Sequence, residues 1–128
     1  MKSLILLLIV LVCGGCEELN HAWNGNHDAM IAAHENQLAQ EQQRRDDYVA
    51  AHPNLETNIV QKITSGNVCV GMTEDEVRAS WGGGEENSSG GLNGSFDQWF
   101  YPTYVGICCS GTYLYFKNGT LVSWQKSN

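Results

Sequence analysis

The side chains that could carry out catalysis are cysteines, histidines and acids, and their positions argue against an active site. The chain of 128 residues contains five cysteines and four histidines. A nucleophilic thiol or hydroxyl needs a general base within hydrogen-bond reach. The histidines all precede the region that we expect to fold, at positions His21, His27, His34 and His52. The acids at 74–76 and 85–86 are explained by helix capping and solvation. We therefore expect no enzyme activity.

Metal and phosphate sites are equally poorly supported. His27 and His34 are seven residues apart, two helical turns, whereas helical zinc motifs place their histidines at i and i+4. Including Glu35 as a third ligand does not bring His27 and His34 close enough to bind one ion. The glycine-rich stretch 82–94 lacks a preceding strand, a following helix and a lysine, which a phosphate-binding loop requires. We expect no metal, no cofactor and no small-molecule substrate, and we interpret 82–94 as a flexible linker.

The start of the chain predicts covalent modification of a cysteine. Residues 4–12 are an unbroken apolar run, shorter than the roughly 20 residues of a membrane-spanning helix and typical of a signal peptide. The run ends in Cys13-Gly14-Gly15-Cys16. Small residues before a cysteine resemble a bacterial lipobox, although Cys13 stands where leucine is usual. We expect residues 1–15 to be a lipoprotein signal peptide and Cys16 to be the lipidation site, acylated with palmitate. The alternative is an ordinary secretory peptide whose cysteines are incidental.

This resemblance also implies a cellular location and a redox environment. Glu17 follows the cysteine, and lipoproteins that lack aspartate there are usually sent to the outer membrane, where the cell has one. Disulfides are permitted outside the cytoplasm. The remaining thiols are Cys69, Cys108 and Cys109. We favour a bridge from Cys69 to Cys108 or Cys109; a vicinal 108–109 bridge and three free thiols remain open.

Residues 16–53 are predicted to form an acidic tether. They contain 2 cations and 7 anions, a net charge of −5. Asp28 can cap a helix over 29–51, and Pro53 ends it. Because 40–47 is polar on every face, we expect a solvated spacer rather than a core element. The whole chain carries −7 and no basic cluster, which excludes a nucleic-acid-binding protein.

Residues 54–128 have the patterns of a small folded domain. Leu55, Ile59 and Ile63 recur every four residues and predict a short helix that ends near residue 65. Thr73 and Glu76 form a capping box for a second helix, which ends at the glycines from residue 82.

The last third of the chain predicts a sheet with strands at 98–105, 112–116 and 120–124. Asn118-Gly119 is the strongest short hairpin signal. A two-residue turn there sets the register, and opposed residues share a face. The pairs expected are Lys117–Thr120, Phe116–Leu121, Tyr115–Val122, Leu114–Ser123 and Tyr113–Trp124.

These pairs give the hairpin two different faces. We expect Leu114, Phe116 and Leu121 to lie beneath the helices because they have no polar tip to satisfy. The opposite face would then be open to water and would bind a partner protein, since Tyr and Trp are enriched at binding hot spots. Its expected members are Tyr113, Tyr115, Val122 and Trp124. The alternative is that the tether or the glycine-rich loop covers them.

The motifs together resemble a known family. Val70-Gly71-Met72-Thr73 with Glu76-Val77 and Trp81-Gly82, the aromatic Gln98-Trp99-x-Tyr101, and the hairpin around Asn118-Gly119 resemble the SmpA/OmlA (BamE-like) lipoprotein domain over residues 55–126. That domain is similar to one repeat of the β-lactamase-inhibitor-protein fold. The resemblance implies an α+β fold, with two short helices packed on one face of a three-stranded antiparallel sheet. Its best-known members are accessory subunits in outer-membrane protein assembly.

Two functional classes follow from these observations. The first is a non-catalytic interaction module, held on the membrane by its lipid, that binds an envelope protein and acts as an outer-membrane assembly accessory. The second is a proteinaceous inhibitor or periplasmic binding module that uses the same aromatic face. A structural lipoprotein without a fixed partner is a third hypothesis.

Overall fold

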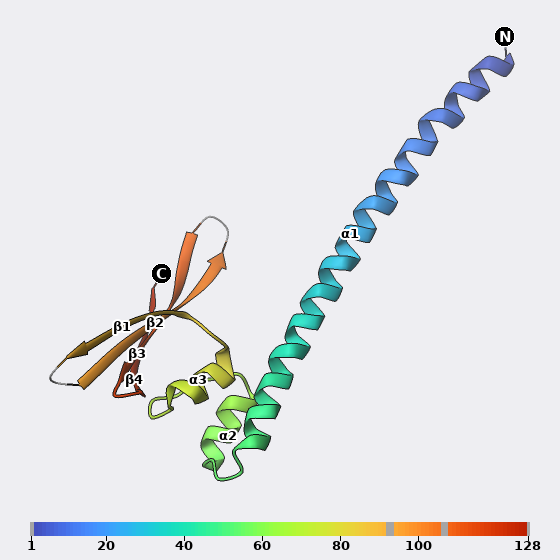
Figure 1. Ribbon diagram of the computed structural model, residues 1–128. Helices are drawn as coiled ribbons and strands as arrows, with labels where there is room; N and C mark the ends of the chain where they lie inside the picture. The colour runs from blue at the N-terminus through green and yellow to red at the C-terminus, as the bar shows by residue number, and fades with distance from the viewer. Residues whose placement is uncertain (1, 92–93, 106–107, 128) are drawn as a thin grey trace. The chain divides into compact units, whose positions relative to one another are not determined.

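The computed structural model describes residues 2–91, 94–105 and 108–127, and it is an α+β fold (Figure 1). The helices are α1 (Lys2–Ala51), α2 (Thr57–Thr64) and α3 (Glu74–Trp81). The strands are β1 (Glu85–Gly91), β2 (Gly94–Val105), β3 (Cys108–Lys117) and β4 (Thr120–Ser127). They form one antiparallel sheet in the order β1-β2-β3-β4. The predicted fold class is thus confirmed, but the described sheet has four strands where three were expected.

The chain divides into two compact units, Met1–Gln40 and Glu41–Asn128. The last part of α1 therefore belongs to the second unit, which begins earlier than the boundary between residues 53 and 54 expected from the sequence. Arg44 and Arg45 bind backbone carbonyls of α3, and Tyr48 and Val49 pack against the core. The prediction that 40–47 is a solvated spacer is wrong for these arginines. Arginine counts as polar in a pattern, yet its aliphatic stem packs against protein while its head donates hydrogen bonds.

The two short helices form as predicted. Ile63 of α2 is fully buried. At the start of α3 the Glu76 amide donates to the Thr73 hydroxyl at 3.3 Å, and the Thr73 amide donates to the Glu76 carboxylate at 2.8 Å. This is the expected capping box. Gly82 ends the helix with φ of 84°, a conformation that favours glycine.

The expectation of a flexible linker over 82–94 is wrong for Glu85–Gly91, which forms β1. This strand pairs with β2 in continuous register from Glu85–Phe100 to Gly91–Gly94. Its Asn, Ser and Gly residues have low strand propensity, so nothing in its own side chains predicts a strand. Pairing instead satisfies the backbone groups along the open side of β2, which begins at Gly94.

The β3–β4 hairpin follows the predicted register only near its turn. Lys117–Thr120 and Phe116–Leu121 pair as expected. A β-bulge then shifts β4 by one residue, so the pairs become Tyr115–Ser123, Leu114–Trp124 and Tyr113–Gln125. The predicted pairs Tyr115–Val122, Leu114–Ser123 and Tyr113–Trp124 are therefore wrong. A bulge inserts one unpaired residue and re-aims the side chains beyond it, and here the inserted residue is Val122.

The hydrophobic core joins residues of α2 and α3 to residues of β2, β3 and β4 on one face of the sheet. Leu114, Phe116 and Leu121 are buried there, as expected, and Trp99 of β2 joins them. The Trp99 and Phe116 rings meet at a centroid distance of 4.6 Å. Among the described residues of this unit, no helix packs on the opposite face of the sheet. The members of the core are Ile63, Met72, Val77, Ala79, Trp99, Leu114, Phe116 and Leu121.

Candidate interaction surface

The face of the sheet away from the helices carries four aromatic rings and one valine, which together we call the aromatic face. It consists of Phe96, Phe100, Tyr113, Tyr115 and Val122. The β2–β3 register pairs Phe96 with Lys117, Gln98 with Tyr115 and Phe100 with Tyr113. These pairs alternate with the buried pairs that contain Trp99 and Phe116. Because alternate residues of a strand point to opposite faces, all of these rings lie on one side.

Two rings of the aromatic face pack on each other, and other members of the face are largely exposed to water. Phe100 and Tyr113 meet at a centroid distance of 4.6 Å with a tilt of 31°. The Lys117 ammonium lies 5.7 Å from the centre of the Phe96 ring. Phe96 keeps 48% of its surface exposed and Val122 keeps 46%. A surface made of such residues combines a large apolar area with few conformational degrees of freedom.

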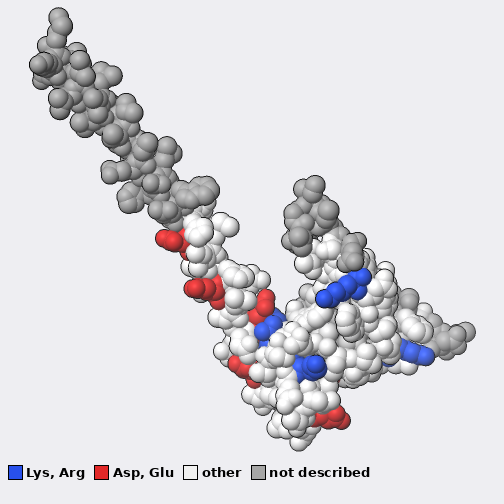
Figure 2. All heavy atoms as spheres, turned by 180° about the vertical axis from the view of Figure 1, so that it is seen from behind, with Lys and Arg blue, Asp and Glu red and all other residues white. Residues whose placement is uncertain are grey.

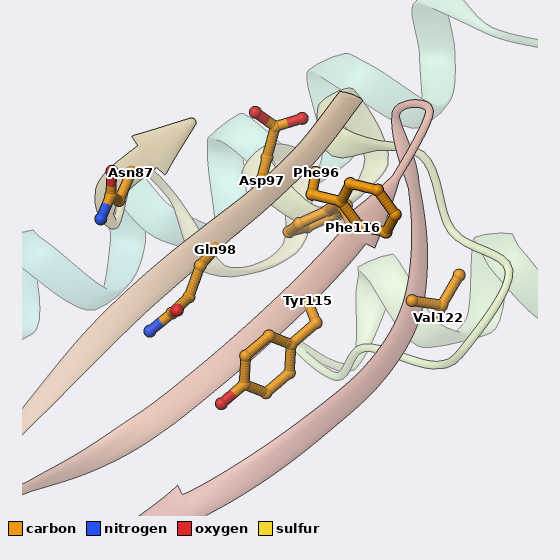
Figure 3. A pocket seen from close by; sticks show the side chains of 7 residues that line it. All are labelled: Asn87, Phe96, Asp97, Gln98, Tyr115, Phe116 and Val122. Atoms are coloured by element: carbon orange, nitrogen blue, oxygen red, sulfur yellow. The ribbon is translucent and has the colours of Figure 1, made fainter. Parts of the chain in front are cut away.

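An open groove of about 220 Å³ crosses this part of the sheet (Figure 3). The Gln98 and Tyr115 side chains project to the same side, and Val122 reaches the groove from the neighbouring β4. The groove thus offers ring faces, an amide and a phenol together. Its lining residues are Asn87, Phe96, Asp97, Gln98, Tyr115, Phe116 and Val122.

A glycine on β3 makes room for one of the rings. Gly111 pairs with Pro102 of β2, and the Phe100 ring lies where a side chain at 111 would be. A Cβ added to Gly111 would also come within 2.7 Å of the Tyr101 carbonyl oxygen. The ring covers the gap that the glycine leaves, so the position of Phe100 depends on a residue that has no side chain.

The structure brings together three of the four residues predicted for partner binding. Tyr113, Tyr115 and Val122 belong to the aromatic face, whereas the bulge places Trp124 opposite Leu114 and so on the other face. Phe96 and Phe100 were missed because the strand was expected to begin at residue 98. The alternation Phe96-x-Gln98-x-Phe100 was the signal in the sequence that could have found them.

Trp124 lies on β4, an edge strand of the sheet, and is 49% exposed. Residues 122–126 are all exposed, in contrast to the buried Leu121 before them. Trp124 is therefore still accessible to a partner, but at the edge rather than on the aromatic face.

The thiol of Cys69 is free, which contradicts the predicted bridge to Cys108 or Cys109. The Cys69 amide donates to the Met72 sulfur at 3.2 Å, and the Met72 carbonyl accepts from the Leu121 amide. Leu121 pairs with Phe116, and Cys109 lies seven residues from Phe116 along β3, or about 24 Å in a strand. A disulfide needs Cα atoms within roughly 7 Å. The side chains of Cys108, Cys109 and Cys16 lie outside the described residues.

The charged groups on the helix side of the sheet have structural partners. Arg78 binds Glu86 at 2.7 Å, and its guanidinium lies 4.5 Å from the centre of the Trp99 ring. Burial, together with the nearby Asp97 carboxylate, raises the pKa of Glu74. Burial also raises the pKa of Tyr101 to about 12, and the Tyr101 hydroxyl donates to the Gly82 carbonyl at 2.8 Å. These contacts connect α3 to β1 and β2.

Among the residues whose side chains are described, no three of the His, Cys, Asp and Glu residues are placed to hold a metal ion. The helical parts that could be searched contain no segment long and apolar enough to cross a membrane. On the face shown in Figure 2, Lys and Arg side chains are separated by uncharged surface.

Comparison with known proteins yields no relative: no family model matches the chain, and neither does a curated protein or a solved structure. The candidate function therefore rests on the residues and geometry described above.

Proposed function

We propose that this chain is a lipid-anchored protein of the bacterial cell envelope whose folded unit binds another envelope protein through the aromatic face. The observation that carries the proposal is the set of partly exposed rings around the groove of about 220 Å³. Covering such a surface gains roughly 25 cal/mol for each Å² of apolar area removed from water. Docking of a partner would bury these rings, which the fold itself leaves partly exposed.

The chemistry of the face fits a protein partner better than a substrate. The groove is open, and its lining combines apolar rings with the Gln98 amide and the Tyr115 phenol, which form hydrogen bonds. Tyrosine is frequent at the centres of protein interfaces because it offers a large rigid ring and one polar atom. The occupant that we propose is an extended segment of the partner with one or two apolar side chains.

The proposed attachment to the membrane rests on the sequence. The apolar residues 4–12 followed by Cys13-Gly14-Gly15-Cys16 support acylation of Cys16, and two or more acyl chains give stable membrane binding. The order of two short helices followed by antiparallel strands supports membership of the SmpA/OmlA-like group, which includes assembly accessories of the outer membrane. The long α1 and the additional strand β1 are features beyond that pattern.

Crosslinking in the native envelope tests the docking face. We would replace Phe96 and Tyr115 by Ser in the full chain and identify the proteins crosslinked to it. The matched control is Val70→Ser, because Val70 is 59% exposed but lies outside the aromatic face. We expect the partner to be lost with the double variant and retained with the control, while circular dichroism shows both folded. Retention of the same partner by the double variant would refute the docking face. A soluble enzyme as the partner would favour the inhibitor hypothesis instead.

Labelling with palmitate tests the anchor separately. Cys16→Ser should abolish incorporation of the label and release the chain from the membrane fraction. Cys13→Ser is the matched control, since it removes a neighbouring thiol and should leave labelling unchanged. Equal labelling of the Cys16→Ser variant and the unsubstituted chain would contradict lipidation at this residue.

A further inference from the structure

We infer that the open edge of β4 pairs with the same edge of a second copy of this chain, with Gln125 at the two-fold axis. This inference concerns the edge of the sheet and does not depend on the aromatic face. It begins from the direction of the backbone groups of β4.

The first part of the β4 edge is already occupied by the chain itself. The Leu121 amide donates to the Met72 carbonyl, and the Leu121 carbonyl accepts from the Gly71 amide, both at 2.8 Å. Thr73 and Thr120 form a further bridge. Leu121 therefore directs its backbone groups away from β3, and this edge accepts antiparallel partners.

Beyond the bulge, the same geometry leaves backbone groups directed outward with exposed side chains around them. The register of β3 is regular, so Leu114 and Thr112, like Phe116, direct their backbone N–H and C=O groups toward β2 and away from β4. Their partners are Trp124 and Lys126, whose N–H and C=O groups must point to the open edge. Edge strands are usually protected by charges, prolines or bulges. The bulge of β4 lies at Val122, and the residues beyond it, 123–127, hold one charge and no proline.

Self-pairing of this edge has three registers that join outward-directed groups, and two of them are excluded. If Trp124 lay at the two-fold axis, Ser127 of the second copy would face Leu121, whose backbone groups are already bound to Gly71 and Met72. If Lys126 lay at the axis, two ammonium groups would face each other, which is unfavourable.

The register with Gln125 at the axis avoids both conflicts: none of residues 123–127 of the second copy faces Leu121, and the two Lys126 ammonium groups do not face each other. Trp124 then faces Lys126 of the second copy, and these two residues exchange backbone hydrogen bonds on each side of the axis, four bonds in total by the antiparallel pattern. The Lys126 ammonium comes beside an indole ring, a favourable cation–π arrangement. This charge and ring complementarity favours a second copy as the occupant. The interface is self-complementary, as a two-fold dimer requires, and it is small, so we expect a weak dimer.

Cysteine crosslinking reads the register directly. In the proposed dimer the two Gln125 residues face each other as a non-hydrogen-bonded pair, with Cα atoms about 4.5 Å apart, within the range of a disulfide. Under mild oxidation the full-length Gln125→Cys variant, purified in detergent, should form a covalent dimer. Ser123→Cys is the matched control, because residue 123 is also exposed on the same strand, yet two such cysteines would be about 14 Å apart. Both yields are compared with that of the unsubstituted chain, which has its own thiols. Equal yields from the two variants overturn the proposal.

Sedimentation over a concentration series measures the association without a covalent trap. The Lys126 amide points to the open edge, so Lys126→Pro removes two of the four hydrogen bonds between copies and none within the sheet. We expect the dissociation constant to rise roughly tenfold or more with Lys126→Pro. Lys126→Ala keeps the amide and should weaken the dimer less. A chain that remains monomeric throughout, including one that pairs this edge with another protein, overturns the proposal. A dissociation constant that is unchanged by Lys126→Pro also overturns the proposal.

Discussion

Arg45 is the residue whose replacement should most clearly show that the end of α1 is part of the folded unit. Its Nε donates to the Ser80 carbonyl at 2.9 Å, and its side chain is only 17% exposed. Ser80 itself is fully buried. Because Gly82 ends α3 shortly after, this carbonyl lies in the last turn, at the negative end of the helix dipole. Arg45→Ala removes the positive charge that compensates that dipole.

The magnitude follows from three contributions. A hydrogen bond from a charged donor contributes about 1.5–3 kcal/mol, and its loss leaves a buried carbonyl without that partner. The favourable interaction of a cation with a helix C-terminus adds about 0.3–1 kcal/mol, and the aliphatic stem loses its packing. Contributions overlap, so we expect Arg45→Ala to lower the free energy of unfolding by about 2–3 kcal/mol. Arg44 makes longer bonds, 3.2 Å to the Ala79 carbonyl and 3.5 Å to that of Ser80, and Arg44→Ala should cost about half as much.

Urea denaturation of the full chain measures this difference, with Gln43→Ala as the matched control. Gln43 lies on the same helical turn, but its side chain is exposed and bonds only Asp47 among the described contacts. The control should change stability by less than about 0.5 kcal/mol. Arg45→Lys keeps the charge without the planar donor group and should be intermediate. Hydrogen exchange at 41–51 should accelerate in Arg45→Ala. If Arg45→Ala and Gln43→Ala lower stability equally, the proposed docking of α1 through this arginine is refuted.

Three further changes test other parts of the unit. Gly111→Ala should destabilise the fold by about 1–3 kcal/mol, because the added methyl group meets the Phe100 ring and the Tyr101 carbonyl; an unchanged thermal midpoint would contradict this packing. Thr73→Ala should cost about 1 kcal/mol and Thr73→Ser much less, since serine keeps the capping oxygen; equal costs would show that the cap is unimportant. The pKa of Tyr101 is raised from 10.0 to about 12, so the unfolded chain loses this proton first as pH rises. The resulting stabilisation is complete below pH 10 and declines between pH 10 and about 12. Tyr101→Phe should show a smaller decline over that window in denaturation curves, and an identical decline would contradict the assignment.

Much of the local structure could be predicted because its causes are local. The capping box, the four-residue spacing of Leu55, Ile59 and Ile63, and the Asn118-Gly119 turn all involve residues close together in the chain. Propensity, capping and turn geometry act over a few residues, so these signals can be interpreted without knowing the fold. They correctly located α2, α3 and the β3–β4 turn.

The candidate site could be predicted only in part. Tyr113, Tyr115 and Val122 were found because alternation in a strand is a local pattern. Trp124 was assigned to the wrong face because one inserted residue reverses every later side chain. The bulge occurs next to Leu121, whose backbone binds Gly71 and Met72 about 50 residues earlier, and no pattern within β4 indicates that contact.

The sequence by itself determined the α+β class, the two short helices, the turn between β3 and β4 and the buried face of the sheet, since each depends on hydrophobic spacing or on a short turn motif. Tertiary structure alone decided that 85–91 is a strand, that Arg44 and Arg45 attach the end of α1 to the unit, and that Trp124 lies at an open edge. The physical reason is the same in each case. One element leaves backbone N–H or C=O groups exposed, and these groups can bind another segment only once the chain has folded. They are the groups along the open side of β2, the last carbonyls of α3 and the groups on the outer side of β4.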